Sequence, residues 1–185
     1  MDFPDDSRSF VLADIDRDGR LEVILKNRNA PQLRVLRNAM KEIGDSIAFR
    51  LRGQKSNRDA IGAAVTVESG TLRQTKYLQA GSGFLSQHTR ELFFGLGKGE
   101  GPVRATVRWP SGLTQTFENL PANRRIEIQE GANEFLAKAF AASPPSYAHA
   151  GSALASESLP SAVETWLIEP LSAPDFSLAD LAGKT

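Results

Sequence analysis

The sequence predicts an all-β protein whose main domain is an antiparallel β-sandwich or a barrel-like fold. Between residues 47 and 130, about seven short segments alternate apolar and polar residues, and Gly/Pro turns separate them. A loop of alternating aspartates comes before them, near the amino end. The alternation of apolar and polar residues between 47 and 130 is typical of antiparallel strands that turn one face to a core and the other to water.

We expect strands where the alternation is clearest, at residues 47–52, 61–68, 72–80, 91–96, 103–109, 113–118 and 124–129. The apolar members of these strands are the predicted core: Phe49, Leu51, Val65, Val67, Leu92, Phe94, Val107, Trp109, Phe117, Ile126 and Ile128. A chain of 185 residues is long enough to bury one such core.

The loop of residues 14–22 places aspartates at every second position and contains a glycine. Hard divalent cations prefer oxygen ligands, so the loop predicts a calcium ion that braces a β-hairpin. It is not an EF-hand, because Leu25 stands where that motif places its glutamate and residues 21–25 read as a strand. The alternative is that Asp18-Gly19 forms an ordinary turn and the other aspartates are solvated.

Residues 7–38 resemble one FG-GAP/VCBS repeat, a blade of integrin-type β-propellers, through their acidic loop and the segment at 33–38. The resemblance implies that Ca²⁺ is bound by four side chains and one carbonyl: Asp14, Asp16, Asp18 and Glu22, and the carbonyl of Arg20. Glu22 replaces the more common Asp. A single repeat of about 40 residues cannot bury both faces of its strands. We therefore interpret residues 1–40 as a partial blade and expect further blades before Met1.

Residues 41–132 resemble the ASPIC/UnbV domain, which is found beside calcium-binding propellers in bacterial secreted proteins and in vertebrate cartilage acidic proteins. The resemblance rests on four ordered segments at 51–63, 81–87, 94–97 and 107–112. It implies a non-enzymatic adhesion or interaction module of a larger secreted protein, extracellular or periplasmic. Its expected partners are other domains of the parent protein and an extracellular protein or glycan.

Two polar loops of this domain contain candidate ligand-binding residues: Ser56, Asn57, Arg58, Asp59, Ser86 and Gln87. The planar guanidinium of Arg58 suits a carboxylate or sulfate, and the second loop would contribute if both lie at one end of the sheet. The alternative for residues 56–59 is a structural loop whose polar side chains bond the backbone.

Composition argues against several other functions. The 22 basic and 22 acidic residues cancel, so no global field attracts nucleic acid, and no membrane span is indicated. The chain has no cysteine and only two histidines, which excludes thiolate chemistry and histidine-rich metal sites within these residues. Arginines 50, 52, 104 and 108 alternate along two predicted strands, and we interpret them as solvated strand faces.

Beyond residue 132 we expect a short helix at 133–142, because apolar residues recur there at helical spacing, and then a disordered linker at 143–170. Residues 171–185 resemble the start of a thioredoxin-like or peroxiredoxin domain, whose catalytic cysteines would lie beyond Thr185. Two alternative functions stay open. One is a scaffold arm of a thioredoxin-like oxidoreductase, and the other is a carbohydrate-binding module.

Overall fold

The computed structural model describes residues 6–28, 32–98 and 101–141. The chain divides into two units, Met1–Ala148 and His149–Thr185, and all the described residues belong to the first. All the regular secondary structure in the described part consists of β-strands, which confirms the predicted all-β class. No helix in this part is long and apolar enough to cross a membrane. The predicted linker at 143–170 and the segment at 171–185 lie outside the described residues.

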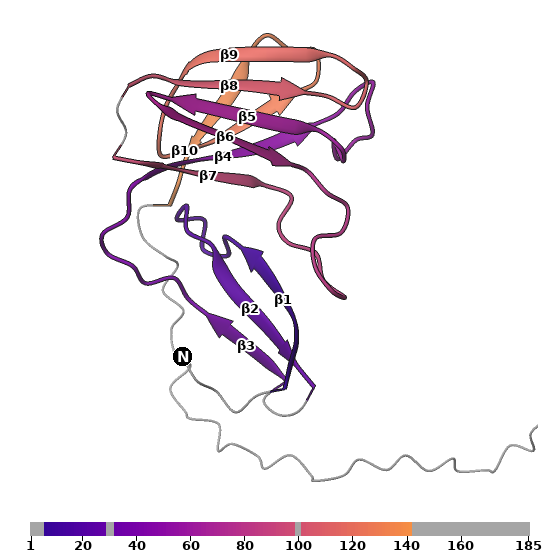
Figure 1. Ribbon diagram of the computed structural model, residues 1–185, viewed down its shortest axis with the longest axis vertical. Helices are drawn as coiled ribbons and strands as arrows, with labels where there is room; N and C mark the ends of the chain where they lie inside the picture. Colours follow the sequence, from indigo (N-terminus) through magenta and orange to yellow (C-terminus); the bar gives the residue numbers. More distant parts are fainter. Residues whose placement is uncertain (1–5, 29–31, 99–100, 142–185) are drawn as a thin grey trace, which may run out of the picture. The chain divides into compact units, whose positions relative to one another are not determined.

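The first sheet has three antiparallel strands in the order β1-β2-β3 (Figure 1): Ser7–Ala13, Glu22–Asn27 and Leu33–Leu36. Both of its faces carry apolar side chains, because Val11, Ile24 and Val35 align across one face while Phe10 pairs with Leu25 on the other. Val35 is 56% exposed and Phe10 44%. The sheet therefore leaves part of its apolar surface uncovered within the described part of the chain.

The remaining strands form two four-stranded sheets, which are the layers of the predicted sandwich (Figure 1). One sheet has the order β11-β10-β4-β7, with strands Phe135–Ala139, Arg124–Gln129, Asp45–Arg52 and Leu92–Gly97. The other has the order β6-β5-β8-β9, with strands Leu72–Tyr77, Ala64–Ser69, Val103–Arg108 and Thr114–Leu120.

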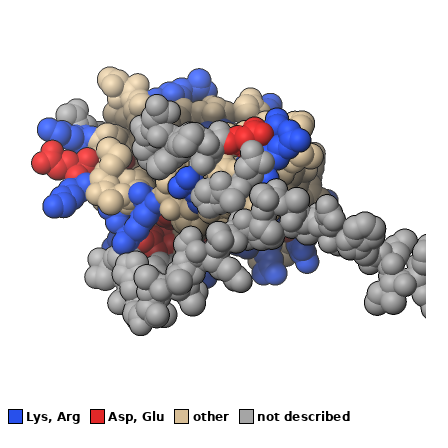
Figure 2. Space-filling view, turned by 90° about the horizontal axis from the view of Figure 1, so that it is seen from below, with Lys and Arg blue, Asp and Glu red and all other residues tan. Residues whose placement is uncertain are grey.

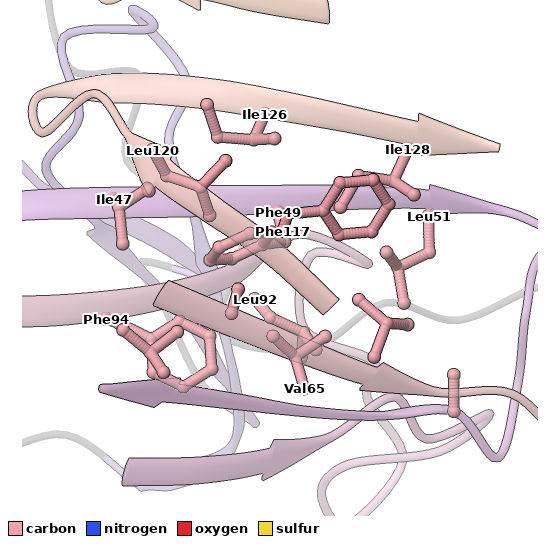
Figure 3. Close-up of a cluster of buried hydrophobic side chains, with 14 of the residues drawn as sticks. Ile47, Phe49, Leu51, Val65, Leu92, Phe94, Phe117, Leu120, Ile126 and Ile128 are labelled. Atoms are coloured by element: carbon pink, nitrogen blue, oxygen red, sulfur yellow. The ribbon is translucent and has the colours of Figure 1, made fainter. Parts of the chain in front are cut away.

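The core lies between these two sheets, and Figure 3 shows side chains of both sheets pointing toward one another. Phe49 and Phe94 meet edge to face there, with ring centroids 5.7 Å apart. Burying an aliphatic or aromatic side chain contributes about 1.5–3 kcal/mol, so this cluster is the main source of stability. All eleven side chains predicted for the core belong to it, which confirms that part of the prediction.

The structure differs from the expectation of an antiparallel sandwich in one pair of strands. β10 runs parallel to β4, with Ile126 aligned to Phe49. The other strand pairs of the described sheets are antiparallel. The parallel pair joins segments about eighty residues apart, so no local pattern in either strand reports it.

The helix predicted at 133–142 is wrong, because Phe135–Ala139 is strand β11. Gly131 turns the chain with a φ of +82°, and β11 then pairs antiparallel with β10 along its open edge. Phe135 packs on the core through an edge-to-face contact with Phe117, at a centroid distance of 6.2 Å. A short segment has only weak intrinsic helicity, so the backbone hydrogen bonds offered by β10 decide its conformation.

The arginines noted at alternating positions do not share one face of the sandwich. Arg50 belongs to β4 and Arg108 to β8, which lie in different sheets. On the outer face of the second sheet, Arg104 pairs with Glu118 at 2.9 Å, and Glu68 pairs with Arg73 at 3.2 Å. This face is therefore a solvated strand face of alternating charge, as expected.

Candidate metal centre

The acidic loop joins β1 to β2, so the predicted hairpin is present. Two residues with positive φ shape the loop, Arg17 at 61° and Gly19 at 86°. Asp14 accepts the amide N–H of Gly19 at 3.0 Å, and Asp18 accepts that of Arg20 at 2.9 Å. These bonds curl the backbone so that carboxylate oxygens of Asp14, Asp16 and Asp18 lie within 4.8 Å of one another.

Two oxygens of this group are buried and accept no hydrogen bond from the described residues: Oδ1 of Asp14 and Oδ1 of Asp16. The Asp16 side chain is only 3% exposed. A buried acceptor without a partner carries the full cost of its lost hydration, so native proteins seldom leave one. A cation among the three carboxylates would satisfy both oxygens.

The electrostatics of the loop point the same way. Burial, aided by repulsion from Asp18, Glu22 and Asp16, raises the pKa of Asp14 to about 6, although the Gly19 N–H acts to lower it. Burial also acts to raise the pKa of Asp18, but hydrogen bonds from Arg20 outweigh it and lower that pKa. Asp14 is therefore the carboxylate whose charge is least compensated by the chain itself.

Glu22 is buried at the start of β2, and its carboxylate meets backbone donors. Oε2 accepts the N–H of Ile15 at 3.0 Å, and Oε1 lies 3.5 Å from the amide nitrogen of Asn38. These bonds tie the loop to β2 and to the segment after β3. The role of Glu22 as a calcium ligand stays a prediction, as does that of the Arg20 carbonyl.

Two basic side chains at the site were not identified from the sequence. The guanidinium of Arg20 binds the Asp18 carboxylate and also donates to the Met40 carbonyl at 2.9 Å. Arg37 lies 3.3 Å from Asp16. The sequence indicates a role for Arg20 only through its carbonyl, and Arg37 follows β3 with no local pattern that links it to the loop. Both place positive charge beside the aspartates in this structure.

The segment that follows β11 contacts the same loop. Ala141, two residues after β11, donates its N–H to the Arg17 carbonyl at 2.6 Å. Phe140 packs against Gly19 so closely that a Cβ on that glycine would lie 2.6 Å from the ring. The loop is thus held from outside its own hairpin, and Gly19 is required both by its φ and by this contact.

The first polar loop of the sandwich is largely structural. Glu130, 2% exposed, accepts the N–H groups of Gln54 and Ser56 at 2.7 Å each and the Ser56 hydroxyl at 2.9 Å. The Ser111 hydroxyl is a fourth donor. Burial acts to raise the pKa of Glu130, but these donors, led by Ser111, lower it to about 2. No short-range pattern marks Glu130, because its partners are 74 to 76 and 19 residues away.

The other candidate ligand-binding residues separate into two groups. Asn57 caps its own loop, because its side chain exchanges two hydrogen bonds of 2.8 Å with the backbone of Ile61. Asp59 instead pairs with Arg90, and Arg58 lies 3.6 Å from the same carboxylate. With its amide turned to satisfy its neighbours, Gln87 accepts from Arg90 Nε at 3.1 Å. The two loops are thus joined through Arg90.

Ser86 takes no part in that link, and its buried hydroxyl finds no partner among the described residues. His88 accepts the N–H of Leu12 on its Nδ1 at 3.2 Å and stacks at a tilt on Phe10, with ring centroids 5.1 Å apart. Asp59 thus binds Arg90, and His88 binds β1.

A comparison with protein families matches residues 53–135 to the family described as ASPIC and UnbV. The match covers most of the sandwich and supports the resemblance stated for residues 41–132. A comparison with curated proteins found no match.

Proposed function

We propose that this chain is a calcium-binding interaction module of a larger secreted protein, with no catalytic role of its own. Calcium would be bound by the acidic loop and would have a structural role. It would neutralise carboxylates that otherwise repel each other and fix the β1–β2 hairpin. The ASPIC/UnbV domain would supply the surface that meets an extracellular protein or glycan, and other domains of the parent protein would flank it.

One observation supports this proposal above the others. Asp14 and Asp16 each keep a buried oxygen that accepts no hydrogen bond within the described part, and both belong to a group of three carboxylates. Oxygen-only sites of this kind suit Ca²⁺, which tolerates irregular geometry and six to eight ligands. The resemblance of residues 7–38 to a calcium-binding repeat supports the same ion.

The competing interpretation is that arginines replace the cation. Arg20 and Arg37 contact Asp18 and Asp16. Arg37 is half exposed, with 49% of its side chain accessible, and exposed ion pairs contribute only about 0–1 kcal/mol. Neither contact involves the Asp14 carboxylate, whose Oδ1 is buried without a partner among the described residues. The arginines therefore leave the central charge uncompensated, and a calcium ion would not.

Calorimetric titration of the full chain with calcium tests the proposal. We expect one site in the wild type, and we expect Asp16→Ala and Asp18→Ala to weaken binding by at least about a hundredfold, since even changes behind the ligands cost up to that much. Glu118→Ala is the matched control, because Glu118 is a carboxylate on β9 whose partner is Arg104.

Circular dichroism of each variant checks that it is folded. Equal calcium binding by the wild type and the two aspartate variants would contradict the proposal. So would a wild type that binds no calcium at all.

A further inference from the structure

A polar cavity adjoins the metal loop. It has a volume of about 410 Å³ and is lined on one side by Asp14 and Arg17 of the acidic loop. On the other side it is lined by side chains of the sandwich, among them Arg50, Arg125 and Lys138. We call it the junction cavity. Since Asp14 belongs to both places, a cation bound in the loop would lie beside this cavity.

Among the side chains that line the junction cavity, basic groups outnumber acidic ones. Four basic side chains line the cavity, Arg17, Arg50, Arg125 and Lys138, against Glu91 and Glu127. Glu91 accepts from Arg50 and from Arg125 at 3.4 Å each, and Glu127 accepts from Lys138 at 2.7 Å. With Asp14 counted, four basic and three acidic side chains line the cavity, an excess of one positive charge, which rises to two if a bound cation offsets the charge of Asp14.

Arg125 gives independent evidence of an absent acceptor. Its side chain is only 19% exposed, and its buried Nε–H makes no hydrogen bond within the described residues. The nearest recorded acid, Glu127, lies 3.8 Å from that nitrogen, beyond hydrogen-bond range. Guanidinium groups bind two oxygens of a carboxylate or of a tetrahedral oxyanion through paired N–H donors, so a carboxylate or sulfate in the cavity would suit this side chain.

The charge on the opposite wall depends on the metal. In the absence of a cation, Asp14 and its neighbouring aspartates repel an incoming anion. A bound Ca²⁺ would offset two of those negative charges and so weaken the repulsion of an anion in the cavity. Figure 2 shows one face of the molecule, on which Lys and Arg side chains cover more of the described surface than Asp and Glu.

We propose that the junction cavity is a calcium-dependent oxyanion site, which takes a carboxylate or sulfate group carried by the binding partner. The inference rests on the proposed calcium site and names the chemistry of its ligand. By linkage, the oxyanion tightens calcium binding by the same factor as calcium tightens the oxyanion. Two added charges about 10 Å away, at an effective dielectric constant of about 60, predict roughly a five- to tenfold change for a carboxylate with one charge and roughly a fortyfold change for sulfate with two.

The test is an NMR titration of the labelled full chain with sodium sulfate, and separately with sodium acetate, in calcium and in EDTA at constant ionic strength. We expect at least one of the two anions to bind more tightly in calcium, acetate by about five- to tenfold or sulfate by about fortyfold. The stronger of the two identifies the group. Shifts should centre on residues around the junction cavity.

Two pairs of variants locate the site. Arg50→Gln and Arg108→Gln remove the same charge from equivalent strands, but only Arg50 lines the junction cavity. Lys138 lines it as well, whereas Arg58 lines a neighbouring cavity of about 700 Å³ that Arg50 shares. We expect Arg50→Gln and Lys138→Gln to weaken anion binding about three- to tenfold, and Arg108→Gln and Arg58→Gln to leave it unchanged.

The outcomes separate this inference from the proposed function. If calorimetry shows calcium binding but both anions bind equally in calcium and EDTA, the oxyanion site is refuted and the calcium site stands. The inference also fails if Arg58→Gln weakens the anion and Lys138→Gln does not. A wild type that binds no calcium overturns both proposals.

Discussion

Two buried carboxylates, Glu130 and Asp16, are treated in opposite ways by the fold. Glu130 is 2% exposed and Asp16 is 6% exposed, so both have lost most of their hydration. Four donors on two loops replace the lost water around Glu130. Asp16 instead keeps an oxygen with no donor within the described part, and it lies beside two other aspartates. A carboxylate that the chain satisfies is a structural tie, whereas one that it leaves unsatisfied indicates a ligand.

Asp14, which lies beside Asp16 in the acidic loop, differs from Glu130 in its pKa as well. The donors around Glu130 outweigh its burial and lower its pKa to about 2, while burial and neighbouring carboxylates raise the pKa of Asp14 to about 6. The charge of Glu130 therefore stabilises the folded chain, and the charge of Asp14 destabilises it until a cation binds. Substitutions that remove each charge should have opposite effects.

The largest effect is expected for Glu130→Gln. An amide NH₂ would face the N–H and hydroxyl donors that now bind the carboxylate, so the loop at 54–56 and the turn at Ser111 would lose their common anchor. We expect the melting temperature to fall by roughly 5–10 °C. Thermal denaturation followed by circular dichroism measures this, with the exposed Glu134→Gln as control. Equal melting of variant and wild type would contradict the role of Glu130.

The dependence on pH should follow from the same group. A carboxyl whose folded pKa is lowered stabilises the protein above its unfolded pKa, and loses that contribution as pH falls through the folded value. For Glu130 the window runs from about 4.5 down to about 2. Urea denaturation at pH 7 and at pH 3 should show the gap between wild type and Glu130→Gln narrowing at the lower pH. A gap independent of pH would refute the assignment.

Asp14→Asn should have the opposite sign in the absence of metal. In EDTA we expect its melting temperature to rise by about 1–3 °C, because a charge with a raised pKa has been removed. In excess calcium the order should reverse, since only the wild type keeps the full ligand set. Scanning fluorimetry in both buffers decides the question. A variant that is less stable than wild type in EDTA would show that the Asp14 charge is compensated.

The smallest effect is expected for Phe140→Ala. The ring packs on Gly19, next to Asp18, but donates nothing to the metal loop. Its loss should loosen the loop and weaken calcium binding about two- to fivefold without unfolding the sandwich. Calorimetry with Phe84→Ala as control provides the comparison, because Phe84 is 72% exposed. An unchanged calcium affinity would show that the hairpin orders the loop by itself.

The sequence predicted best what depends on neighbouring residues. Alternation within each strand identifies the sandwich core, and the spacing of the aspartates identifies the group of three carboxylates. Each of these patterns spans only a few neighbouring residues. It failed where distant segments decide the outcome. The sequence predicts a helix at β11 because nothing local to that segment shows the open edge of β10 with which it pairs. It gives no sign of Glu130 because the donors to that carboxylate lie on loops far along the chain.

The contact between β1 and the loop after Ser86 covers one edge of the three-stranded sheet and so limits where a further strand could pair with it. Leu12 gives its N–H to His88 and its carbonyl to the N–H of Thr89, so the outer rim of β1 is already occupied at that point. The other rim belongs to β3, a strand of only four residues. A strand from another chain therefore could not pair beside Leu12, and the described β3 has only the four residues Leu33–Leu36 for such pairing.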